Sequence, residues 1–188
     1  MKRWRLSLNG AVLAVLLAGS VGKVAGEPEF EFTPPVTEDA AFGRTLSMLD
    51  QERAEYAESL AKYAANLVRE REASEDSLRQ ARRLLAVALH LAPRSREALV
   101  VKFQLEKGVF PAEKRVDYNP EVLARLLLTR AQLLAKQDAD GEKLLARCFV
   151  DLAAFIDPRN EDAVYAYQLQ TIDHGELDWK QVTDAKSE

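Results

Sequence analysis

"ALHLAPRSREAL" (Ala88–Leu99) and "AAFIDPRNEDAV" (Ala153–Val164) are two stretches of one chain with the same order of residue types. Each passes from apolar residues to a Pro-Arg pair, and then to a polar residue, an acid and an alanine. Proline cannot continue a helix, whereas Ser95 and Asn160 are of the residue types that cap helix starts. Each stretch therefore predicts the end of one helix, a tight turn and the start of the next.

The sequence around these turns predicts an all-α fold. Apolar residues recur at intervals of three, four or seven, which is the spacing of amphipathic helices, and no run alternates like a β-strand. Glycine (8) and proline (7) are sparse among the 188 residues, which suits a single helical domain. We expect about six antiparallel helices: from Ala40 or Arg44 to about Arg71, from Ser74 or Asp76 to Pro93, from Ser95 to Gly108, from Asn119 to the turn at Asp138–Gly141, from that turn to Pro158, and from Asn160 to His174.

The two stretches also indicate an internal repeat. Ala88 is the first residue of one stretch and Ala153 is the first residue of the other. We call this shift along the sequence, from position 88 to position 153, the repeat offset. It is close to twice a repeat unit of about 34 residues. Identical residues recur at this offset: Ala81 and Ala146, Ala88 and Ala153, Pro93 and Pro158. Small residues let paired helices approach closely, and the proline ends one helical hairpin before the next begins.

The alanine and proline spacing of seven and five resembles the second-helix signature of the tetratricopeptide repeat. The resemblance covers roughly residues 44–174 and implies a right-handed α-solenoid of stacked α-α hairpins. The chain departs from the pattern at Arg69 and Leu134, where the family has a small residue, and across the irregular segment 108–119. A generic α-helical bundle is the alternative.

The beginning of the chain predicts export. Residues 1–26 combine a basic start, a short apolar run at Ala11–Ala18 and small residues before Glu27, which is the pattern of a signal peptide. The apolar run is about half of the ~20 residues that span a bilayer. We therefore expect a periplasmic protein, with a membrane anchor formed by an uncleaved segment as the alternative.

The rest of the chain divides into three predicted parts. Residues 27–40 are rich in proline and acids and predict an extended linker, with docking through Phe30 and Phe32 as the alternative. Residues 41–175 form the helical domain. Residues 176–188 form a C-terminal tail, which we expect to be frayed from Asp178 to Glu188, with Trp179 packing back as the alternative.

Charge and motifs argue against several functions. Outside the first 26 residues lie 22 of the 26 basic side chains and all 30 acidic ones, a balance that disfavours nucleic acid. The single cysteine, Cys148, falls on an apolar helical face and cannot form an internal disulfide. His90 and His174 are the only histidines, and we interpret both as structural. No catalytic residue, metal ligand or cofactor is predicted.

The tetratricopeptide resemblance implies that first-helix side chains line a concave surface for a protein or peptide partner. It indicates nine partner-binding candidates: Tyr63, Asn66, Glu70, Val100, Gln104, Lys107, Tyr165, Leu169 and Ile172. For Tyr63, Val100, Leu169 and Ile172, burial in the core is the alternative.

We therefore expect a non-catalytic, exported interaction module, such as a scaffold or adaptor of an envelope complex. The alternatives are a structural subunit that forms homo-oligomers through an exposed helix face and, ranked lower, an enzyme accessory subunit with an unrecognised site.

Overall fold

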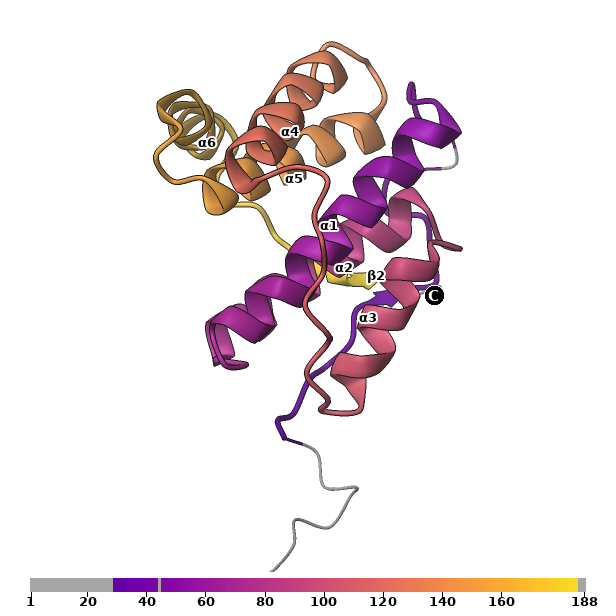
Figure 1. Cartoon of the computed structure of the whole chain (residues 1–188). Helices are drawn as coiled ribbons and strands as arrows, with labels where there is room; N and C mark the ends of the chain where they lie inside the picture. The colour runs from indigo at the N-terminus through magenta and orange to yellow at the C-terminus, as the bar shows by residue number, and fades with distance from the viewer. Residues whose placement is uncertain (1–28, 44, 186–188) are drawn as a thin grey trace, which may run out of the picture.

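A computed structural model describes residues 29–43 and 45–185, and the predicted signal peptide at 1–26 lies outside this range. The described part is helical apart from two short strands (Figure 1). None of its helices is long and apolar enough to cross a bilayer. The elements are β1 Val36–Thr37, α1 Asp50–Glu70, α2 Glu75–Leu91, α3 Arg96–Glu106, α4 Pro120–Leu134, α5 Asp140–Ile156, α6 Glu161–His174, α7 Lys180–Thr183 and β2 Asp184–Ala185.

The two Pro-Arg turns have nearly the same geometry. After α2, Ala92 has φ −140° and ψ 87°, and after α5, Asp157 has φ −131° and ψ 85°. The Ser95 hydroxyl then accepts a hydrogen bond from the Ala98 N–H at 3.4 Å, and the Asn160 side chain accepts one from Ala163 at 3.1 Å. The predicted stop and restart of the helices are confirmed at both places.

The helices form two similar units of three. The ends of α2, at positions 75 and 91, recur at the repeat offset as the ends of α5, at positions 140 and 156. The starts of α3 and α6, at positions 96 and 161, have the same offset. Within the first unit α1 packs on α2 and α3, and within the second α5 packs on α4 and α6. Figure 1 shows the second unit at the upper left and the first at the lower right.

Aromatic contacts join the two units. The Tyr56 ring of α1 lies 5.2 Å from the ring of Phe149 in α5, and its hydroxyl donates to the Leu126 carbonyl at 3.2 Å. The Arg71 guanidinium lies over the Phe155 ring at 5.6 Å. These contacts tie α1 and Arg71, the residue after it, to the second unit.

The first helix begins later than predicted. It starts at Asp50, so the expected start at Ala40 or Arg44 is wrong. Phe42 and Met48 are buried, but they reach the core from irregular backbone that turns at Gly43 (φ 76°). This backbone lies close to the start of α5, where a Cβ on Gly141 would stand 2.2 Å from the Phe42 carbonyl oxygen.

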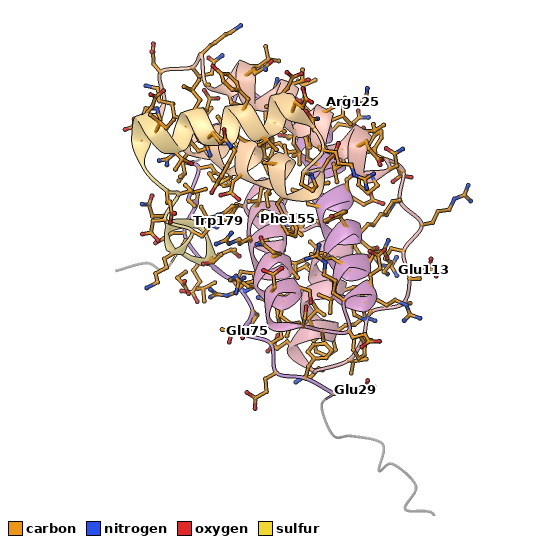
Figure 2. All side chains as sticks on the ribbon, turned by 90° about the vertical axis from the view of Figure 1, so that its left-hand side faces the viewer. Glu29, Glu75, Glu113, Arg125, Phe155 and Trp179 are labelled. Carbon is orange, nitrogen blue, oxygen red and sulfur yellow. The ribbon has the colours of Figure 1, made fainter. Side chains whose placement is uncertain are left out.

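The two ends of the described chain are not loose. In the linker, Val36–Thr37 pairs in parallel with Asp184–Ala185 of the tail. Trp179, labelled in Figure 2, is only 6% exposed. Its indole N–H donates to Asp151 at 3.2 Å, and the Arg83 guanidinium lies 5.0 Å from the centre of its ring. The expectation of a frayed tail is therefore wrong for residues 178–185. The linker is docked on the domain, and Phe30 and Phe32 pack against its core, which is the alternative that the sequence left open.

We expect Trp179→Ala to lower the free energy of unfolding by about 3–5 kcal/mol, because a buried indole leaves a large cavity. Trp179→Phe keeps most of the packing but loses the hydrogen bond, which costs about 1 kcal/mol. Urea unfolding measures both changes, with the exposed neighbour Gln181→Ala as the control. A Trp179→Ala protein as stable as the parent would contradict the packed tail.

Candidate functional site

The structure separates the nine predicted partner-binding residues into three places. Tyr63, Asn66 and Glu70 lie on α1; Val100 and Gln104 lie on α3, with Lys107 just after it; Tyr165, Leu169 and Ile172 lie on α6. They do not form one continuous groove, because the segment between α3 and α4 crosses α1 (Figure 1). The three places differ in what surrounds them.

On α1, the chain itself covers the predicted surface. We call residues 108–118 the strap. The Asn66 amide donates to the Lys114 carbonyl at 2.9 Å, and its oxygen accepts the Lys114 N–H at 2.8 Å. Arg69 donates to the Pro111 carbonyl at 3.4 Å, and Lys62 pairs with Asp117 at 2.8 Å.

These contacts occupy the Asn66 side chain, so it is not free to bind a partner. Tyr63 is half-buried beside it, and burial raises the pKa of its hydroxyl. Glu70 is exposed at the end of α1.

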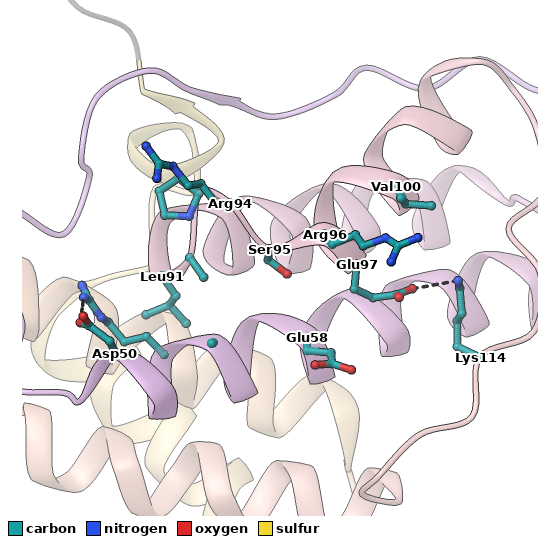
Figure 3. A pocket seen from close by; sticks show the side chains of 13 residues that line it. Asp50, Glu58, Leu91, Arg94, Ser95, Arg96, Glu97, Val100 and Lys114 are labelled. Carbon is teal, nitrogen blue, oxygen red and sulfur yellow. Dashed lines mark hydrogen bonds and ion pairs between the residues drawn. The ribbon is translucent and has the colours of Figure 1, made fainter.

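On α3, the predicted residue Val100 borders a charged cleft of about 800 Å³ between α1 and α3 (Figure 3). Two ion pairs lie within its lining: Asp50 binds Arg53, and Glu97 binds Lys114 at 2.9 Å. More than half of the residues that line this cleft are charged, and Gln104 and Lys107 are not among them. Gln104 is half-buried, and the Lys107 ammonium lies 5.6 Å from the centre of the exposed Phe103 ring.

An open groove of about 790 Å³ lies between α4, α5 and α6. We call this the second-unit groove. Most of its surface is apolar, from Leu128, Ala131, Ala146, Val150, Ala166 and Leu169. Leu169 is the one predicted residue that lines it, while Tyr165 and Ile172 project from α6 at 66% and 80% exposure.

Polar side chains form the rim of the groove. Arg147 donates to the Gly175 carbonyl at 2.8 Å, and the Gln170 amide donates to the Arg147 carbonyl at 3.4 Å. Within the described residues, the side chains of Gln132 and Lys143 make no hydrogen bond or ion pair. The rim thus presents the Gln132 amide and the Lys143 ammonium without a hydrogen-bond partner among the described residues.

The groove residues of α4 and α5 were missed by sequence reasoning, although a signal for them exists. The repeat offset carries Tyr63 to Leu128, Asn66 to Ala131 and Glu70 to Ala135, and all three of these residues, in α4 or just after it, line the groove. Applying the repeat to the predicted site would have found these three residues, but not those of α5.

Titratable groups do not assemble a reactive site in the part of the chain that the structure describes. Cys148 is fully buried, and burial raises the pKa of its thiol, which keeps it protonated. His90 packs edge-on against Phe42 at 5.4 Å, and its Nε2 lies 2.8 Å from the Val182 carbonyl. No cluster of three or more His, Cys, Asp or Glu there could hold a metal ion.

Comparison with protein-family models, curated proteins and solved structures finds no match to this chain.

We expect His90 to make stability depend on pH. Burial lowers its pKa below the ordinary value of 6.5, an effect that the bond to Val182 opposes. The folded protein therefore binds this proton less tightly than the unfolded chain does, so the free energy of unfolding falls as the pH drops below about 6.5. Urea unfolding between pH 5 and 8 should show this slope, and His90→Gln should remove it. The same loss of slope in His174→Gln, which changes an exposed histidine, would contradict the assignment.

Replacing Asn66 should release the strap. Asn66→Ala removes both hydrogen bonds to Lys114 and should cost about 1–3 kcal/mol of stability. Limited trypsin digestion should then cut faster after Lys114 and Arg115, whereas Glu70→Ala on the same helix should leave the rate unchanged. Equal rates in both variants would show that Asn66 does not hold the strap.

Proposed function

We propose that this protein is a non-catalytic interaction module, built from tetratricopeptide-like helical units, that docks a partner protein in the second-unit groove. The observation that carries the proposal is the open, mainly apolar groove of about 790 Å³ between α4, α5 and α6. Contiguous exposed apolar surface bordered by polar groups is typical of protein-binding sites.

The sparse burial of α6 supports this role. Among its 14 residues only Ala163 is buried. Tyr165, Leu169 and Ile172 follow one another at four and three residues, so they share one side of the helix and stay in water. A helix within a stack is ordinarily covered by its successor, and here the chain leaves α6 at Gly175.

We further propose that the module works outside the cytoplasm, in the periplasm. The support is the signal-peptide pattern of residues 1–26. Anchoring to the membrane by an uncleaved leader is the alternative, and either arrangement suits a scaffold or adaptor of an envelope complex.

A self-associating structural subunit is the second candidate, favoured by α3. Leu99, Val100 and Phe103 are 46%, 39% and 59% exposed, so the third helix of the first unit also leaves apolar side chains in water. If copies pair through this face, light scattering after size-exclusion chromatography will show a dimer that Phe103→Glu dissociates. The interaction-module proposal expects a monomer.

The partner-docking proposal is tested with two charge substitutions on exposed leucines. Leu169→Glu places a carboxylate in the groove, whereas Leu49→Glu places one at a leucine that is 77% exposed and does not line the groove. In quantitative pull-downs from envelope extracts, proteins retained by the parent should fall about tenfold with Leu169→Glu and persist with Leu49→Glu. Equal recovery with both variants would reject the groove as the docking site.

A further inference from the structure

We infer that the second-unit groove receives an extended segment of another protein that inserts an aromatic side chain and carries acidic residues beside it. This inference rests on the proposed docking function and specifies the chemistry of the partner. It comes from comparing the two units of the chain, because the first unit is filled at the corresponding place.

The repeat defines which places correspond. In the groove, Leu128 and Ala131 of α4 are the counterparts, at the repeat offset, of Tyr63 and Asn66 of α1. On the other wall, Ala166 and Leu169 of α6 are the counterparts of Val101 and Gln104 of α3. The groove therefore corresponds to the region between the C-terminal halves of α1 and α3.

In the first unit, the strap occupies that region. It leaves α3 with the Val109 N–H donating to the Gln104 carbonyl at 3.0 Å, and it crosses to α1, where Asn66 holds the Lys114 backbone. Between these points Phe110 packs against the core and Pro111 is buried.

A second extended segment meets the strap there. The Glu29 N–H donates to the Gly108 carbonyl at 2.8 Å, and the rings of Phe30 and Phe110 pack edge-on at 5.1 Å. Figure 2 shows Glu29 at this end of the first unit. Both segments have acids near their aromatic residues, "EFEF" at 29–32 and "FPAE" at 110–113. In the first unit, the region between α1 and α3 is thus covered by two extended segments, the strap and residues 29–32, which both carry acidic and aromatic side chains.

The second unit lacks such a closure among the residues that the structure describes. After α6 the chain turns at Gly175 (φ 74°) and runs to α2, where Val182 meets His90. Figure 1 shows this segment leading away from α4. In addition, α3 packs closely on α1 whereas α6 touches α4 little, which leaves room for an inserted side chain.

Charges on the rim favour an acidic partner. Lys143 and Arg147 line the groove with one carboxylate, Asp173, among the described residues. The unengaged Gln132 amide is able to bind a peptide backbone in the way that Asn66 binds Lys114. A second copy of this chain is a poorer occupant, because its own Phe30 and Phe110 are already packed.

The test uses a fluorescein-labelled peptide with the sequence EPEFEFTPP, which is residues 27–35 of this chain, added to the full chain. Fluorescence anisotropy should show saturable binding. A peptide with both phenylalanines changed to alanine should bind at least about tenfold more weakly, because the aromatic burial is lost. Leu169→Glu should weaken binding of the parent peptide by about tenfold, and Lys143→Glu by about threefold, with Leu49→Glu unchanged.

Several results would overturn the inference. They are no binding of the EPEFEFTPP peptide, equal binding of the alanine peptide, and binding that survives Leu169→Glu, which would place the peptide outside the second-unit groove. A dimer that Leu169→Glu dissociates would identify a second copy as the occupant instead. If the peptide fails while pull-downs still lose proteins with Leu169→Glu, the partner chemistry is wrong and the docking function stands.

Discussion

Close packing through alanine holds each pair of long helices together, and the other elements are attached to these pairs. Ala57, Ala61 and Ala64 of α1 and Ala81 and Ala88 of α2 have no exposed surface. Such small side chains allow helix axes to approach to the lower end of the usual range of about 8–10 Å. A methylene added at this contact would overpack it and push the helices apart. The α4–α5 pair is built on the same rule, with Ala124 and Ala153 fully buried.

The same local rules yield two units with different surfaces. The turns before α3 and α6 share their backbone angles and their caps, so both third helices start in the same way. The units differ in the path of the chain beyond those helices. After α3 the strap returns over α1, whereas after α6 the chain departs at Gly175. The two units therefore share their helices but differ in their surfaces: the strap covers α1 in the first unit, whereas the groove beside α4 stays exposed in the second.

Local signals predicted most of the helices. Pro93, Pro158 and the caps Ser95, Asn119 and Asn160 act within one turn of backbone, so their effect does not depend on distant residues. The pairing of β1 with β2 was not predictable, because strands of two residues have no periodicity and their partners are far apart in sequence.

The candidate site was predictable in part: Leu169 follows from the helical stripe of α6, and the α4 wall follows once the repeat is applied. The covering of Asn66 was not, because it depends on the path of an irregular segment. The tetratricopeptide resemblance stays a prediction, since helical hairpins of this kind also occur in other bundles.

The β1–β2 pairing has a consequence for the order of folding. Val36 pairs with Asp184, so this contact closes a loop that contains nearly the whole described chain. Contacts within each helical hairpin are local and form quickly, whereas the entropy of closing a long loop delays distant contacts. We therefore expect the two units to form before the ends meet across α2, with Trp179 buried in the last step.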